Sequence, residues 1–306
     1  MKKEFYSHGK LLLTGEYVVL DGALSLAIPT TKGQSLEVCD SEKNGVYWKS
    51  IAHDGSVWYE DHFNFDLLFS DSLTIDSGTH QVRKTLLKIL RKAKELNPEF
   101  LKNIEGIAVT TQLEFPANWG LGSSSTLINN IAQWAGIDAF QLLQKSFGGS
   151  GYDIASANHD SPILYQFNSE KPSVTPVRIP WDFTDKLFFV FLNKKQNSKE
   201  GIARYRTSEK NTSELISKIS DITVALIHCE TLKDFDSLLD AHEQLISNAV
   251  DLPTVKDSIF PDYQGGLKSL GAWGGDFILA TGGESNRDYF KRKGFLTVVP
   301  FSEMIV

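Results

Sequence analysis

The stretch that most constrains this chain is an alternating apolar run, a loop rich in glycine and serine, and a helical pattern, one directly after another. Residues 107–115 alternate with the period of a strand. The loop reads Pro116-Ala-Asn-Trp-Gly-Leu-Gly-Ser-Ser-Ser125. Residues 126–135 carry apolar side chains at helical spacing, namely Leu127, Ile128, Ile131, Ala132 and Ala135. The sequence therefore predicts a strand, a tight turn and a helix.

A turn rich in glycine and serine before a helix is well suited to bind an anion. Glycines let backbone N–H groups approach a phosphate without obstruction by a Cβ atom, and the helix start adds positive partial charge. Serine hydroxyls can donate to phosphate or bind Mg²⁺. We therefore predict a phosphate-binding loop and phosphoryl transfer. Small residues before a helix also serve as caps and tight turns, so the loop alone leaves a purely structural role open.

Better-known loop motifs are absent. There is no G-x-x-x-x-G-K-[ST], and a G-x-G-x-x-G that begins at Gly120 is broken by Ser125. The D-F-G of protein kinases fails because Asp276-Phe277 is followed by isoleucine. The G-x-S-x-G of serine hydrolases fails because Gly148-Gly-Ser-Gly is followed by tyrosine.

Composition predicts a cytoplasmic protein that binds small molecules. The chain has 306 residues, enough for two domains, and a formal net charge of −7, which does not favour nucleic acid or a membrane surface as partner. The first residues lack an apolar signal segment, and no stretch approaches the ~20 apolar residues of a membrane span. Cys39 and Cys229 lack metal-binding spacing and are expected to be free thiols in a reducing compartment.

Three further segments, together with the loop, resemble the GHMP kinases (galactokinase, homoserine kinase, mevalonate kinase and phosphomevalonate kinase) in their order along the chain. They are Ser7-His-Gly-Lys-Leu-Leu-Leu-Thr-Gly-Glu-Tyr-Val-Val-Leu-Asp-Gly22, Gly148-Gly-Ser-Gly-Tyr-Asp-Ile-Ala155 and Lys268-Ser-Leu-Gly-Ala-Trp-Gly-Gly-Asp276. The loop itself fits the family pattern P-x-x-x-G-L-G-S-S. Gly15-Glu-Tyr-Val-Val-Leu20 and the segment from Gly149 are most similar to phosphomevalonate kinases.

The resemblance implies an α+β protein with the two-domain GHMP kinase fold. Residues 1–175 would form the N-terminal ATP-binding domain, which is ribosomal protein S5 domain 2-like. Residues 185–306 would form a ferredoxin-like C-terminal domain, and the active site would lie in the interdomain cleft. Prolines within residues 168–185 mark the boundary.

The patterns also predict individual elements. A helix over residues 81–97 would bury Val82, Leu86, Ile89, Leu90 and Ala93, and Asp54-Gly55 predicts a hairpin turn. Further helices are expected over residues 212–229 and 233–250. Strands are expected over residues 10–13, 17–20, 35–40, 46–51, 56–60, 187–192, 277–280 and 295–299.

For the chemistry, the resemblance implies that Asp153 is the catalytic base. It also implies that Lys10 pairs with Asp153 and reaches the acceptor hydroxyl or the transferring phosphoryl group. Taken by itself, Asp153 could equally cap a helix, and Lys10 could be a solvated lysine before a strand.

ATP and Mg²⁺ are the implied cofactors. Ser124 matches the family serine that binds Mg²⁺, and the other residues expected to bind ATP are Pro116, Asn118, Gly120, Leu121, Gly122, Ser123 and Ser125. Mevalonate kinases carry a glutamate Mg²⁺ ligand before the catalytic aspartate, but the equivalent residues 140–145 contain no carboxylate. Ser124, ATP oxygens and water would then hold the ion. Trp119 would either line the nucleotide site or pack in the core.

The small-molecule acceptor is expected to contact residues from several segments. These are His8, Glu16, Tyr17, Ser150, Gly151, Lys195, Ser198, Arg204, Gly274 and Gly275. The best local source of positive charge for an acceptor phosphate is a basic cluster of Lys194, Lys195, Lys199, Arg204 and Arg206. Surface lysines are, however, usually only solvated. Ser198 could instead cap the next helix. Trp273 replaces a family glycine and could form a lid, while Asp276 matches the phosphomevalonate kinase form or is a solvated turn residue.

These observations predict an ATP- and Mg²⁺-dependent transferase of the mevalonate pathway of isoprenoid biosynthesis. The acceptor favoured by the motifs is 5-phosphomevalonate, and mevalonate is the alternative. Diphosphomevalonate decarboxylase is less favoured, because its aspartate lies in a different context. A catalytically silent nucleotide- or metabolite-binding protein of the same fold also stays open, and a homodimer is compatible with the sequence.

Overall fold

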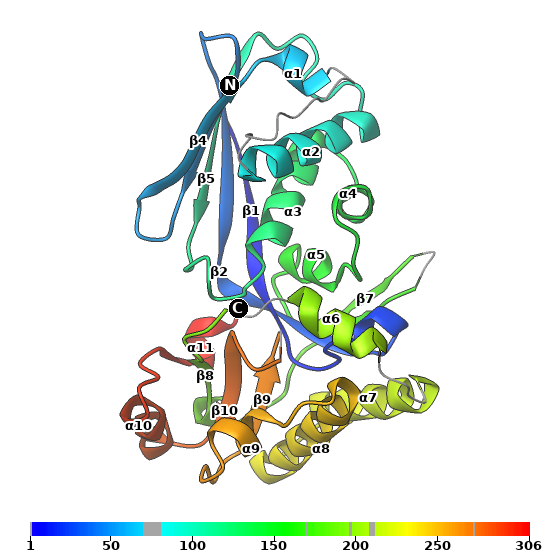
Figure 1. Cartoon of the computed structure of the whole chain (residues 1–306), viewed down its shortest axis with the longest axis vertical. Helices are drawn as coiled ribbons and strands as arrows, with labels where there is room; N and C mark the ends of the chain where they lie inside the picture. The colour runs from blue at the N-terminus through cyan, green and yellow to red at the C-terminus, as the bar shows by residue number, and fades with distance from the viewer. Residues whose placement is uncertain (1, 70–80, 169–170, 196–197, 208–211, 272) are drawn as a thin grey trace. The chain divides into compact units, whose positions relative to one another are not determined.

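The computed structural model describes residues 2–69, 81–168, 171–195, 198–207, 212–271 and 273–306 (Figure 1). The described chain contains helices and β-sheets and divides into two compact units. The first unit comprises Met1–Gly9, Lys32–Ala117 and Gly122–Asn158. The second comprises Lys10–Thr31, Asn118–Leu121 and His159–Val306.

The sheet of the first unit has the order β4-β3-β5-β2, and β1 also pairs with β2. The β3–β4 hairpin is antiparallel and turns at Gly55, whose φ is 83°, so the predicted Asp54-Gly55 turn is confirmed. Strand β3 runs parallel to β5, and β5 runs antiparallel to β2. The strands are β1 (Lys2–Leu12), β2 (Ser25–Asp40), β3 (Gly45–Ile51), β4 (Val57–Phe63) and β5 (Gly106–Leu113).

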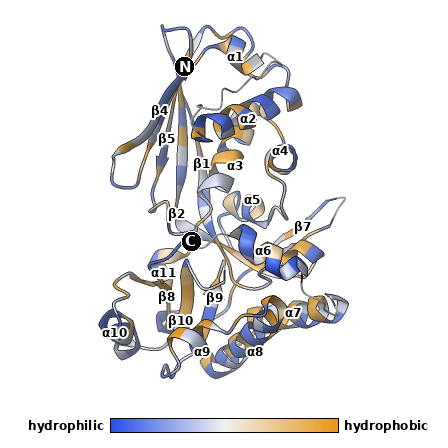
Figure 2. Cartoon of the chain, viewed as in Figure 1, coloured by the Kyte–Doolittle hydropathy of each residue, from blue (hydrophilic) through white to orange (hydrophobic). Residues whose placement is uncertain are grey.

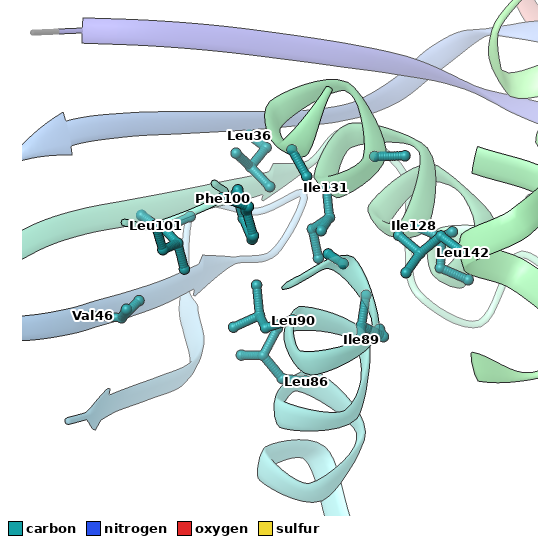
Figure 3. Packing of buried hydrophobic residues seen from close by; sticks show 14 of the residues in the cluster. Leu36, Val46, Leu86, Ile89, Leu90, Phe100, Leu101, Ile128, Ile131 and Leu142 are labelled. Atoms are coloured by element: carbon teal, nitrogen blue, oxygen red, sulfur yellow. The ribbon is translucent and has the colours of Figure 1, made fainter. Parts of the chain in front are cut away.

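Helices pack on this sheet and close the core of the first unit. They are α1 (Phe65–Phe69), α2 (Gln81–Leu96), α3 (Ser123–Ala135), α4 (Ala139–Ser146) and α5 (Tyr152–Ala157). Helix α2 confirms the predicted helix and the burial of Leu86, Ile89, Leu90 and Ala93. Val82, which was also expected to be buried, is only half-buried. In Figure 3, Leu90 points from α2 toward Phe100. Full burial of such a side chain stabilises the fold by about 1.5–3 kcal/mol, so this face determines where the helix packs.

The second unit has its own antiparallel sheet in the order β11-β8-β10-β9. Every residue of β8 and β10 is buried. The strands expected over residues 187–192 and 277–280 are confirmed. In Figure 2, β10 is one hydrophobic stretch, whereas α8 carries both hydrophobic and hydrophilic residues. The strands are β8 (Leu187–Phe191), β9 (Leu267–Leu270), β10 (Phe277–Thr281) and β11 (Val298–Pro300), preceded by the short 3₁₀ helix η2 (Thr184–Lys186).

Further elements complete the second unit. The first residues of β2 pair with β6 (Ile163–Gln166), which pairs with β7 (Ser173–Pro176). Helix α7 (Thr212–Ile227) packs along α8 (Leu232–Val250), which in turn contacts β9. The other helices are α6 (Ser198–Thr207), α9 (Val255–Ile259), α10 (Glu284–Arg292) and α11 (Phe301–Met304).

The strand predicted over residues 17–20 is wrong. Val18–Asp21 forms a 3₁₀ helix, η1, because Gly15 and Tyr17 adopt positive φ angles of 92° and 63° and turn the chain. Burial of Val18 and Val19 outweighs their preference for a strand. Several boundaries also differ: α3 begins at Ser123 rather than at residue 126, and β11 is shorter than the strand predicted over residues 295–299.

Candidate functional site

The glycine-rich loop between β5 and α3 has the backbone conformation that its sequence predicts. Gly120 and Gly122 have φ angles of 71° and 88°, a region that glycine adopts readily. Gly122 is the N-cap of α3, and within the described residues no side chain caps this helix. The first N–H groups of a helix have no partner within it, so the start of α3 suits an anion.

The three serines of the loop differ in what their hydroxyls can do. Ser125 is buried and its Oγ donates to the carbonyl oxygen of Gly122 at 2.8 Å, so its proton is used within the loop. Ser123 is half-buried and its carbonyl accepts from Thr126 Oγ1 at 3.0 Å. Ser124 is exposed. Among the three, Ser124 is therefore best placed to offer its hydroxyl to a ligand or metal ion.

Lys10 is bound to the same loop within the second unit. Its N–H donates to the carbonyl of Leu121 at 3.0 Å, and its Nζ donates to the carbonyl of Gly120 at 3.2 Å. Lys10 is only 8% exposed to solvent. Lys10 is thus not a solvated lysine before a strand; its ammonium group is held at the turn where the sequence predicts phosphate.

Asp276 lies beside this turn, whereas the motif alone left a solvated role equally open. It is 8% exposed and has a φ of 54°. Its N–H donates to the carbonyl of Lys194, and its carbonyl accepts from the N–H of Leu192, both at 2.8 Å. A Cβ atom placed on Gly120 would lie 2.6 Å from the Asp276 Cγ. The solvated alternative is therefore wrong, and the segments that carry Lys10 and Asp276 meet the glycine-rich loop at Gly120.

Asp153 lies in the first turn of α5 in the first unit. The N-cap of α5 is Gly151, with a φ of 84°, so Asp153 is not the cap. It is half-buried, and its Oδ1 accepts from the N–H of Ile154 at 3.0 Å. Helix α5 packs against α3, the helix that begins at Ser123 (Figure 1).

Other residues expected at the acceptor or nucleotide occupy varied surroundings. In the first unit, Ser150 is buried, and the half-buried His8 meets the ring of Tyr6 edge-on at 5.2 Å. Pro116 is half-buried and Asn118 is exposed. Trp119 packs edge-on against Phe277, with ring centroids 5.1 Å apart, as the core-packing alternative predicts.

Glu16 belongs to a buried ionic cluster of the second unit. Lys268 Nζ donates to Glu16 Oε1 and lies 3.2 Å from Glu243 Oε1. Burial raises the pKa of Glu16 to about 7, and the nearby Lys268 opposes this rise. Burial, followed by the charge of Lys268, lowers the pKa of His242 well below its ordinary value. His242 Nε2 accepts from the N–H of Gly15 at 2.9 Å, which fits a neutral ring.

Tyr17 and Trp273 are interior residues as well. The Trp273 N–H donates to the Tyr17 hydroxyl at 2.9 Å, and its Nε1 donates to the carbonyl of Pro253 at 3.0 Å. Trp273 is 6% exposed. The lid expected at this position is therefore wrong, because the indole packs inside the second unit. Gly274, with a φ of 81°, and the buried Gly275 follow it in the turn before β10.

One member of the basic cluster after β8 forms an ion pair within the fold. Arg206 pairs with Asp21 at 2.6 Å, and the Tyr205 hydroxyl donates to the other oxygen of the same carboxylate. Lys195 and Arg204 are exposed. Ser198 begins α6, but its side chain lies outside the described residues, so the predicted cap and acceptor contact stay predictions.

A metal ion would find few ligands here. Within the ranges described, no group of three or more His, Cys, Asp and Glu side chains is arranged to hold one. Mg²⁺ would fit here only together with phosphate oxygens and water as further ligands, which is how this ion is usually bound in proteins.

None of the helices in these ranges has the length and apolar character needed to cross a membrane.

Comparisons with known proteins show the fold. No family model matches the chain, and no curated protein matches it. The structure is similar to mevalonate kinase from Methanococcus jannaschii, at 17% identity and a TM-score of 0.68, over 96% of this chain and 94% of that one. It is similar to Streptococcus pneumoniae phosphomevalonate kinase in complex with phosphomevalonate and AMPPNP, at 14% identity and a TM-score of 0.69, over 97% of this chain and 99% of that one.

Lactococcus lactis galactokinase complexed with galactose is also similar, at 16% identity and a TM-score of 0.66, over 95% of this chain and 88% of that one. The chain has the GHMP kinase fold. The α+β architecture and the family resemblance expected from the motifs are thereby confirmed at the level of the fold. These neighbours are named for different acceptor molecules. The fold therefore does not by itself identify the acceptor of this chain.

Proposed function

We propose that the chain is an ATP-dependent kinase that phosphorylates a small molecule. The observation that carries the proposal is the contact of Lys10 with the glycine-rich loop, where its Nζ donates to Gly120 at 3.2 Å. A buried cation at a glycine turn, next to a helix start without a side-chain cap, is suited to triphosphate. The neighbours of the same fold that are named as kinases support this choice.

In this proposal the backbone of Gly120–Ser124 binds the nucleotide phosphates, and Lys10 offsets the charge that develops on the transferring group. The acceptor oxygen forms a bond to the γ-phosphorus, the bond to the β,γ-bridging oxygen breaks, and ADP leaves. Asp153 accepts a proton that the acceptor oxygen carries. Ser124 would contribute a ligand to Mg²⁺, which neutralises phosphate charge when bound. Positioning and electrostatics supply most of the rate in such reactions.

The acceptor that we propose is 5-phosphomevalonate, with mevalonate as the alternative. The first motif, Gly15-Glu-Tyr-Val-Val-Leu20, resembles phosphomevalonate kinases. The exposed Lys195 and Arg204 offer positive charge to an acceptor that is itself phosphorylated. Glu16 and Tyr17 are buried, so we assign them to the support of the first motif rather than to acceptor contact.

Release of ADP with mevalonate, 5-phosphomevalonate, homoserine or galactose tests the proposal, with Asp153→Asn as the variant. Loss of a general base costs about 10²–10⁴-fold in rate. The loss should be largest for a hydroxyl acceptor, because a phosphate monoester is mostly ionised at neutral pH. Nucleotide binding by Asp153→Asn should be unchanged. Nucleotide binding by the unmodified chain without turnover on any acceptor would instead favour a silent binding protein.

Arg204→Ala and Lys195→Ala test the choice of acceptor. Both should raise KM for 5-phosphomevalonate far more than KM for ATP. Lys233→Ala, which removes an exposed lysine of α8 in the same unit, is the control and should change neither. Equal effects on both substrates would count against a role for this cluster in acceptor binding.

A further inference from the structure

The carboxyl group of Asp276 occupies the space that a side chain at position 120 would need. A Cβ atom on Gly120 would lie 2.6 Å from its Cγ and Oδ2, and 3.0 Å from its Oδ1. A Cβ atom on Gly271 would lie 3.4 Å from the same Oδ2. The acidic group is therefore packed between two glycine turns, and position 120 has to be glycine for it to lie there.

The backbone holds this carboxyl group at some cost. Asp276 has a φ of 54°, in the left-handed region that side chains other than asparagine and aspartate rarely adopt. Its N–H and carbonyl are both bound, to Lys194 and Leu192, at 2.8 Å. Gly271, Gly274 and Gly275 lie close by in the chain, so glycine is common in this turn and yet absent at position 276. Aspartate tolerates this conformation, and the two backbone hydrogen bonds of Asp276 hold its carboxyl group against Gly120.

A carboxylate at this place is unfavourable for a phosphate site unless a cation separates the two anions. Like charges a few ångströms apart repel strongly even at a protein surface. Lys10 supplies one cation, with its Nζ 3.2 Å from the carbonyl of Gly120. A hard divalent ion with oxygen ligands is the other species that joins a carboxylate to phosphate.

We infer that Asp276 supplies an oxygen, directly or through water, to the divalent cation that accompanies the nucleotide. This inference rests on the proposed kinase function and adds to it a residue that binds the cation. It predicts an effect of opposite sign in two conditions. Without metal, the carboxylate repels the phosphates; with metal, it helps to bind them.

Asp276→Asn tests the inference with little change of shape, since asparagine tolerates the left-handed region. Asp276→Gly removes both the carboxylate and the backbone strain, and serves if the first variant folds poorly. The control is Asp251→Asn. Asp251 has a φ of 51° at the C-terminus of α8, is exposed, and loses the same charge in the same unit.

The measurements are the affinity for AMPPNP by calorimetry, with EDTA and with Mg²⁺, and the affinity of the AMPPNP complex for Mn²⁺ by electron paramagnetic resonance. Asp276→Asn should weaken Mn²⁺ binding by about tenfold or more, as losses around metal sites do. Its affinity for AMPPNP in EDTA should be unchanged or higher. Asp251→Asn should match the unmodified protein throughout.

An equal loss of AMPPNP affinity with and without metal would overturn the inference, because it would mean that Asp276 only shapes the loop or orients Lys10. Unchanged Mn²⁺ affinity would overturn it too. Either result leaves the kinase proposal standing. If the unmodified protein binds no nucleotide in any condition, the proposed function fails and the inference fails with it.

Discussion

Lys268 lies on β9 with its side chain fully buried between two carboxylates. Its Nζ donates to Glu16 Oε1 and to the carbonyl of Ser269, and lies 3.2 Å from Glu243 Oε1. The side chains of Glu16 and Glu243 are 1% and 4% exposed. Lys268→Met keeps most of the apolar stem and removes the charge. Two buried carboxylates would then remain without the cation that lies between them.

Removing one partner of a buried ion pair typically costs 3–5 kcal/mol, and we expect a loss of about 4 kcal/mol in the free energy of unfolding near pH 8. The carboxylates can escape part of this penalty by taking up protons. Burial already raises the pKa of both Glu16 and Glu243, and loss of Lys268 raises them further. Protonated carboxyls are favoured as pH falls, so the loss should shrink to about 2 kcal/mol or less near pH 5.

Urea unfolding followed by tryptophan fluorescence and circular dichroism, at both pH values, measures the loss. The control is Lys291→Met, which breaks the exposed pair of Lys291 with Asp288 at 3.4 Å on α10. That variant should lose less than about 0.5 kcal/mol at either pH. A loss below about 1 kcal/mol for Lys268→Met near pH 8, or one that does not depend on pH, would refute the argument from buried charge.

Two further substitutions test the same unit. The pKa of Glu16 is about 7 in the folded protein, against an ordinary 4.5. Its contribution to the free energy of unfolding is therefore complete below about pH 4.5 and is lost as pH rises through 7. In Glu16→Gln this contribution is absent, so stability should fall less with rising pH than in the unmodified protein. Identical pH slopes in urea unfolding would contradict this. Gly120→Ala should abolish nucleotide binding in calorimetry and destabilise the protein more than Gly294→Ala. Gly294 has a similarly positive φ of 91°, but no atom of the described residues lies within 4 Å of its Cβ position. Equal losses of stability would show that the Asp276 carboxyl moves aside easily.

Local sequence patterns were enough to predict those elements whose determining residues lie close together in the chain. The spacing of Leu86, Ile89 and Leu90 predicts α2, and Asp54-Gly55 predicts the β3–β4 turn. The loop from Pro116 to Ser125 was recognisable because its glycines and serines lie between a strand pattern and a helix pattern. Where packing opposes local preference, as at Val18 and Val19, the prediction fails, because burial in the second unit depends on residues far away in the chain.

The sequence by itself indicated the fold through the resemblance of four segments, in their order along the chain, to a known family. It placed the glycine-rich loop through periodicity and turn residues, which are properties of neighbouring positions. Only the tertiary structure decided which distant side chains meet. It binds Lys10 to Gly120, packs Asp276 against the same glycine, and turns Trp273 and Glu16 into the interior. An aspartate after glycines and a tryptophan in a loop have no spacing that says whether they face water. The residues that bind Trp273, which are Tyr17 and Pro253, lie far from it in the chain, so only the folded protein brings them together.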